Sequence, residues 1–266
     1  MSEMDDLFAV AARELQTMAR TPAMIALSGA FTLTIVAVAA AGSGARGGFV
    51  PLVLDLLPFV ELLLPLLAFA LCYRVILADR DHGEIDVLRT FGVSRLAYVG
   101  GIYLGRGLTL VTVVGVSLVA AGVTVLVLSP PAPTFLALNT AADSPLAFVR
   151  FGVLAVLFAL TTAAIALAIS AAARTTRQAL AVAIGLLVVF VVGIDATAIA
   201  GVLSGTFGLE TAPALLALSP NGAFRTLVFS LAVDSGSSAS PLLALVGLFA
   251  WLGGSLLLAV ATAWDR

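Results

Sequence analysis

The sequence predicts an all-α membrane protein with about six transmembrane helices, and its composition and its apolar runs both point to this fold class. Of the 266 residues, 61% are hydrophobic and only 11% are charged, whereas soluble domains carry about 25% charged residues. The apolar residues form uninterrupted runs of about 20 residues, the length that a helix needs to cross a hydrocarbon core. Because backbone groups in lipid must be satisfied within the chain, each run predicts a helix.

Residues 1–21 predict a helix that lies in the membrane interface. Phe8 and Leu15 fall on one helical face, and Arg13 and Arg20 fall on another. The expected spans then cover about residues 22–41, 51–78, 99–128, 147–173, 178–203 and 240–263. Residues 79–98 form the most charged loop, and residues 204–239 form an external or re-entrant segment. All of these elements belong to one domain, residues 1–266.

The arginines predict the orientation of the chain. With the N-terminus inside, the inner segments hold ten of the 13 basic residues and the outer segments hold three, Arg46, Arg150 and Arg225. Cytoplasmic loops carry such an excess of positive charge. We therefore expect a multi-pass protein of the inner (cytoplasmic) membrane with both termini in the cytoplasm.

Several classes of function are excluded by residues that the chain lacks. The chain contains no lysine, so it cannot form a P-loop, whose lysine reaches the β- and γ-phosphates of ATP. Its one cysteine, Cys72, and one histidine, His82, have no second ligand nearby in the sequence. We therefore expect no ATPase site, no metal site and no cofactor bound by this chain.

The loop 79–98 predicts a short helix between two spans. Asp81 and Glu84 have the spacing of a capping box, and Ile85 and Leu88, with Arg89, would share a face of the helix. Gly92 ends this helix and Ser94 caps the next. A cytoplasmic helix held between two spans suits the transmission of force from a soluble partner, although a solvated loop would show the same charges.

Two carboxylates lie deepest in the expected spans, Glu61 in the second and Asp195 in the fifth. A charge at this depth is costly, so it faces a polar cavity or has a partner. A substrate-facing or gating cavity and a structural pair with an arginine both fit. No arginine within the spans is an evident partner.

Segment 204–239 contains a second predicted short helix. Ser219 followed by Pro220 is a good helix start, and Phe224 and Leu227 begin an apolar stripe with Arg225 off it. This helix would lie at the external interface or re-enter the membrane.

With these segments placed, the chain resembles the ABC type-2 permease family, and within it the NosY-type permeases of nitrous oxide reductase maturation. The resemblance covers nearly the whole chain. It rests on Ala12-Arg13-Glu14-Leu15, on residues 79–106 with their acidic-Gly loop and Gly-Arg entry to the third span, and on Leu218-Ser219-Pro220-Asn221-Gly222-Ala223-Phe224-Arg225. Gly92 stands where the family often has proline, and Ser219 and Phe224 replace Asn and Tyr.

The resemblance implies a homodimer bound to two copies of an ABC ATPase subunit (NosF-like), which binds ATP and Mg. It implies that ATPase closure acts on the coupling residues Asp81, Glu84, Ile85, Leu88 and Arg89. For the NosY subgroup it also implies an external NosD-like protein, contacted at Pro220, Phe224 and Arg225, and a role in copper-site assembly. Membrane lipid is the remaining partner expected, and nucleic acid is not.

Other functions remain open on the sequence. A type-2 exporter of a lipid, drug or ion would share all of these features. A secondary transporter would need more polar residues in broken helices. A membrane-embedded enzyme would need clustered carboxylates or histidines, and the one cluster, residues 79–86, matches no metal motif.

Overall fold

The computed structural model describes residues 3–128, 144–190, 200, 204, 219–233 and 240–264, and it is an all-α membrane protein. The helices are α1 (Glu3–Arg20), α2 (Pro22–Ala41), α3 (Gly44–Gly47), α4 (Phe49–Cys72), α5 (Val75–Asp81), α6 (Glu84–Thr90), α7 (Arg95–Leu128), α8 (Pro145–Ala172), α9 (Thr176–Val188), α12 (Pro220–Leu227) and α13 (Pro241–Thr262). A π-helix, Val228–Ala232, follows α12.

Five helical segments of the described chain are long and apolar enough to cross a membrane. They are Pro22–Ala41, Phe49–Asp81, Arg95–Leu128, Pro145–Ala172 and Pro241–Thr262. The expected span at about 178–203 corresponds to the shorter apolar helix α9 and continues into residues 191–199, outside the described residues.

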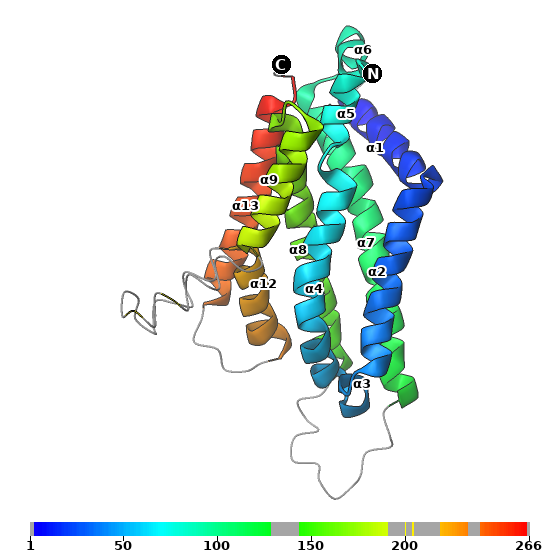
Figure 1. Cartoon of the computed structure of the whole chain (residues 1–266), viewed down its shortest axis with the longest axis vertical. Helices are drawn as coiled ribbons and strands as arrows, with labels where there is room; N and C mark the ends of the chain where they lie inside the picture. The colour runs from blue at the N-terminus through cyan, green and yellow to red at the C-terminus, as the bar shows by residue number, and fades with distance from the viewer. Residues whose placement is uncertain are drawn as a thin grey trace, which may run out of the picture.

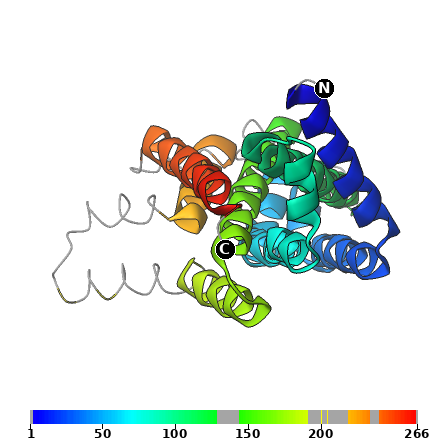
Figure 2. The ribbon, with the colours of Figure 1, turned by 90° about the horizontal axis from the view of Figure 1, so that it is seen from above.

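Helix α8 lies at the centre of the bundle and packs against α4, α7 and α13 (Figures 1 and 2). Its second half is rich in alanine and is buried on every side from Thr161 to Ala171. Small side chains let neighbouring helices approach closely, which suits a helix at the centre of a membrane bundle. By contrast, α2 stands at the edge and leaves most of its apolar side chains on the outside.

Helix α1 crosses one end of the bundle at a steep angle to α2 (Figure 1). The same end holds α5, α6 and the last turn of α13, and we call it the terminal end because α1 and α13 are the first and last helices described. Helix α3 lies at the opposite end, which is also nearer to α12 (Figure 1). Helix α1 and the charged loop therefore meet at one end of the bundle.

Candidate functional site

The loop between α5 and α7 forms the tip of the terminal end. Gly83 and Gly92 bound α6 with φ angles of 74° and 77°, in the left-handed region that glycine adopts without strain. The hydroxyl oxygen of Ser94 accepts a hydrogen bond from the Ala97 N–H at 3.1 Å, so Ser94 caps α7 as expected.

The expected capping box at Asp81 and Glu84 is wrong. The residue that precedes α6 is Gly83, and no side chain caps this helix. Asp81 instead ends α5 as an exposed residue, and the Glu84 carboxylate accepts from Arg13 of α1 at 2.8 Å. The left-handed Gly83 takes the capping position, which frees Glu84 to contact another helix.

The two faces of α6 differ in exposure. Ile85 is 5% exposed and Leu88 is half-buried against the core, so both anchor the helix. Val87 is 55% exposed and Phe91, one residue beyond the helix, is 79% exposed. Arg89 is exposed and lies 3.8 Å from Asp86. The i, i+4 spacing of Val87 and Phe91 is the sequence signal that indicates this exposed apolar pair.

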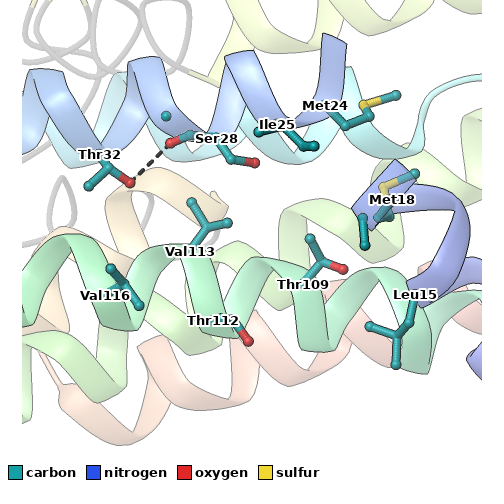
Figure 3. A pocket seen from close by; sticks show the side chains of 12 residues that line it. Leu15, Met18, Met24, Ile25, Ser28, Thr32, Thr109, Thr112, Val113 and Val116 are labelled. Carbon is teal, nitrogen blue, oxygen red and sulfur yellow. Dashed lines mark hydrogen bonds between the residues drawn. The ribbon is translucent and has the colours of Figure 1, made fainter. Parts of the chain in front are cut away.

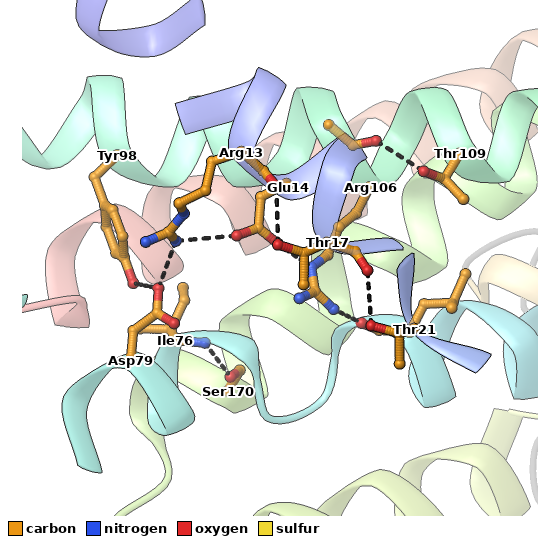
Figure 4. A network of polar contacts seen from close by, with 12 residues as sticks. Arg13, Glu14, Thr17, Thr21, Ile76, Asp79, Tyr98, Arg106, Thr109 and Ser170 are labelled. Carbon is orange, nitrogen blue, oxygen red and sulfur yellow. Dashed lines mark hydrogen bonds and ion pairs between the residues drawn. The ribbon is translucent and has the colours of Figure 1, made fainter. Parts of the chain in front are cut away.

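An arginine network joins α1 to the loop and to α7 (Figure 4). Its members are Arg13 and Glu14 of α1, Asp79 of α5, Glu84 of α6 and Arg106 of α7. Arg13 donates to Glu14 at 3.0 Å, to Asp79 at 2.9 Å and to Glu84 at 2.8 Å. Burial lowers the pKa of Arg13, but the carboxylates of Asp79 and Glu14 outweigh it and raise the pKa above its ordinary value.

The deeper half of the network is buried between α1, α4 and α7. Nε of Arg106 donates to the Glu14 carboxylate at 2.8 Å, and their side chains are 9% and 4% exposed. Another Arg106 nitrogen donates to the carbonyl oxygen of Leu71, near the end of α4. Tyr98 of α7 donates to Asp79 at 2.8 Å. The buried charges of Arg106 and Glu14 are therefore each paired with a charge of opposite sign, as a buried charge requires.

Polar side chains close the break between α4 and α5. The helix is interrupted at Tyr73 and Arg74, which leaves backbone groups on both sides without their usual partners. The Ser170 hydroxyl of α8 accepts from the N–H groups of Ile76 at 3.0 Å and Leu77 at 3.3 Å. Together with Arg106 on Leu71, it satisfies the broken helix from two neighbouring spans.

Arg80 of α5 ties the loop to two more helices. It donates to the carbonyl oxygens of Ala171 at 2.8 Å and Ala173 at 3.1 Å, which belong to the end of α8. It also donates to Ala263 at 3.3 Å, just beyond α13. A cation is favourable at a helix C-terminus, where carbonyl groups lack partners. The loop is thus held to α1, α8 and α13 together.

The glycines of α7 form the surface on which α1 lies. A Cβ atom on Gly101 would come within 2.7 Å of the Leu7 oxygen, and one on Gly105 within 2.7 Å of the Ala11 oxygen. The small-xxx-small pattern Gly101–Gly105 is therefore a docking surface for a helix of the same chain.

Glu61 has an arginine partner that the sequence did not reveal. In the middle of α4 its carboxylate oxygens accept from Nε and NH2 of Arg225 at 2.7 and 2.6 Å. Glu61 is buried and Arg225, on α12, is half-exposed. Of the two interpretations left open for Glu61, the structure shows the pair with an arginine, because α12, which lies outside the expected spans, packs against α4 and brings Arg225 to it.

Two of the three residues expected to meet an external partner lie inside the fold. Pro220 is buried, and Phe224 is 0% exposed and stacks on Phe158 with ring centroids 4.7 Å apart. Their side chains are therefore absent from the surface of the chain, because the apolar stripe of α12 faces α8 and α13. Only Arg225 of this set is partly exposed.

Asp195 lies outside the described residues. Among the residues that are described, no group of three or more His, Cys, Asp or Glu side chains is placed to hold a metal ion.

Comparison with known proteins identifies the family. The model of the ABC-2 family transporter proteins matches residues 8–264. The chain belongs to the ABC-2 transporter family. The ABC-2 chain is 29% identical over 272 residues to the probable ABC transporter permease protein NosY of Pseudomonas aeruginosa, covering 95% of this chain and 96% of the relative. It is 28% identical over 276 residues to the protein of the same name from Stutzerimonas stutzeri, covering 97% and 98%. The ABC-2 chain is therefore a multi-pass membrane subunit of an ABC transporter.

Proposed function

We propose that α6 is the point at which the partner ATPase acts on this membrane subunit. The observation that carries this proposal is the exposure of Val87 and Phe91 on the outer side of α6, with Ile85 and Leu88 anchoring its inner side. Exposed apolar side chains at a tip rimmed by polar residues are typical of a protein contact. The contact surface is then Val87, Phe91 and the exposed charges Asp81 and Arg89.

The arginine network supports a path for the movement. Glu84 of α6 and Asp79 of α5 both bind Arg13, so a displacement of the loop pulls on α1. Glu14, next to Arg13, holds Arg106, which in turn holds the end of α4. Charged hydrogen bonds are strong, and those of Asp79 with Arg13 and of Glu14 with Arg106 are partly or wholly buried, whereas the bond of Glu84 with Arg13 is exposed. In this proposal the loop, α1 and α4 move together, mainly through Asp79.

We further propose that the transporter serves copper-site maturation of nitrous oxide reductase. The support is the likeness to two relatives whose names read NosY, over nearly their whole length. In this assignment the chain forms a homodimer in the cytoplasmic membrane, with the terminal end in the cytoplasm. It binds a NosF-like ATPase through α6 and a NosD-like protein on the opposite side.

Purification of the tagged chain from native membranes tests the contact at α6. We expect an ABC ATPase to co-purify with the wild-type chain and to be lost when both Val87 and Phe91 are changed to serine. Leu96→Ser is the matched control, because Leu96 is also apolar, is 61% exposed and lies close by in the sequence, in the first turn of α7. Equal recovery of the ATPase with the double variant and with the control would contradict the proposed contact.

A deletion strain tests the copper assignment separately. Nitrous oxide reductase from this strain should lack its assembled copper sites, which spectroscopy of the purified reductase measures. The wild-type chain should restore the sites and the Val87→Ser, Phe91→Ser variant should not. Normal copper sites in the deletion strain would remove this assignment and leave the contact at α6 untouched.

A further inference from the structure

An apolar groove runs along α2 and α7 beneath α1 (Figure 3). Its volume is about 480 Å³, and Leu15, Met18 and Val113 are among the side chains that line it. Three of the four hydroxyl groups in its walls already have hydrogen-bond acceptors within the protein. Those of Thr32, Thr109 and Thr112 donate to carbonyl oxygens of their own helices. The groove therefore offers mainly apolar surface to a ligand.

The length of the groove matches an acyl chain. It follows α2 from Met24 to Thr32, a rise of roughly 12 Å at about 1.5 Å per residue. One leaflet contributes about half of a hydrocarbon core that is roughly 30 Å thick. Since α2 is a membrane span that begins at the terminal end, the groove covers most of the depth of one leaflet.

A polar cavity of about 530 Å³ meets the groove at Met24, which lines both. The cavity lies beside the break between α4 and α5 and contains the whole arginine network. The three carboxylates of that network face only two guanidinium groups, which leaves an excess of one negative charge. Arg74, in the break itself, lines the cavity, is exposed, and has no ion-pair partner within the described part of the chain.

We propose that the groove and the cavity together bind one phospholipid with a zwitterionic amine headgroup, phosphatidylethanolamine. One acyl chain lies in the groove, the phosphate pairs with Arg74, and the ammonium group faces the excess carboxylate charge at Glu84 and Asp79. An anionic lipid would satisfy Arg74 but would bring further negative charge toward a network that already carries an excess negative charge, and like charges repel. A headgroup with both charges satisfies both sides of the cavity.

The lipid would bind at the joint between α1 and α2. Its chain would fill the space between α2 and α7, and its headgroup would contact the break in α4. This site is a property of the chain itself and needs no ATPase, so it can fail or hold independently of the function proposed above.

Native mass spectrometry of the delipidated, detergent-purified chain tests this site without any variant. The chain is mixed with equimolar phosphatidylethanolamine and phosphatidylglycerol that carry the same acyl chains. We expect one phosphatidylethanolamine per chain to be retained in at least tenfold excess over phosphatidylglycerol. Equal retention of the two lipids would overturn the proposal. So would the retention of neither lipid, which is the result expected if a second copy of the chain covers the groove.

Three variants, one of them a control, and a soluble probe then locate the site. Arg74→Gln should weaken phosphatidylethanolamine binding by roughly tenfold or more, because a charge-assisted contact is lost. Arg95→Gln, a control at the same end that does not line the cavity, should bind as the wild type does. Met24→Trp should block the junction and displace the lipid, and glycerophosphoethanolamine, which has no acyl chains, should not bind. Identical binding by the Arg74→Gln and Arg95→Gln variants would refute the headgroup assignment.

Discussion

Replacing Gly105 by alanine should lift α1 from α7. The new Cβ atom would stand 2.7 Å from the Ala11 oxygen and 2.7 Å from the Glu14 Cβ. Ordinary contact begins at 3.4 Å, so α1 must withdraw by 0.7 Å, the difference between the two distances. A withdrawal of that size would stretch the 2.8 Å bond between Glu14 and Arg106 toward 3.5 Å, the limit of a hydrogen bond.

The energetic consequence follows from three terms. Overpacking costs about 1–3 kcal/mol. Complete loss of a buried, charged hydrogen bond costs about 1.5–3 kcal/mol, which is the upper limit for the weakened bond between Glu14 and Arg106. The greater helix propensity of alanine returns about 1 kcal/mol. We expect a net loss of about 2 kcal/mol or more. Gly115→Ala on the same helix is the control, since nothing lies within 4 Å of its Cβ position, and it should gain up to about 1 kcal/mol.

Two assays separate these outcomes. Unfolding of each variant by SDS in mixed micelles gives its free energy of unfolding. Trypsin reports on α1 itself, because the chain has no lysine and α1 carries Arg13 and Arg20. Cleavage after Arg13 should be faster in Gly105→Ala than in Gly115→Ala. Equal stability and equal cleavage in the two variants would refute the inference that close glycine contacts hold α1 in place.

Two further substitutions test how the loop is held. Ser170→Ala leaves the Ile76 and Leu77 N–H groups buried without an acceptor. At about 1–3 kcal/mol per group, unfolding in SDS should show a loss of stability of about 2–6 kcal/mol, and a loss below about 0.5 kcal/mol would contradict this role of Ser170. Arg80→Gln removes the cation from the ends of α8 and α13 and should cost about 1–2 kcal/mol in the same assay. Arg89→Gln is the control, because the ion pair of Arg89 with Asp86 is exposed, and it should change stability by less than about 0.5 kcal/mol. Equal effects of the two substitutions would argue against the helix-end contacts.

The parts of the fold that depend on neighbours in the sequence could be predicted. Apolar runs of span length indicated where the long helices lie, because lipid forces each run to be helical. Gly92 and Ser94 indicated the turn before α7, because a left-handed residue and a capping hydroxyl act within a few residues. The capping box failed for the same kind of reason, since Gly83 competed locally for the same position.

The partners of the charged residues could not be predicted, because each pair joins distant parts of the chain. Glu61 and Arg225 are 164 residues apart, and Glu14 and Arg106 are 92 apart. Periodicity places each side chain on a face of its own helix but does not say which helix packs there. The exposed position of Phe91 depends in the same way on how Ile85 and Leu88 anchor α6.

The break between α4 and α5 explains why so many polar groups gather at the terminal end. A continuous helix would satisfy the Leu71 carbonyl and the Ile76 and Leu77 N–H groups by itself. Because the helix is interrupted, side chains from α7 and α8 take over these bonds. A side chain can keep a hydrogen bond while its partner shifts, whereas a backbone ladder holds its geometry. We therefore expect the loop to tilt on α4 at this break while α8 remains fixed, and the arginine network to carry that tilt to α1.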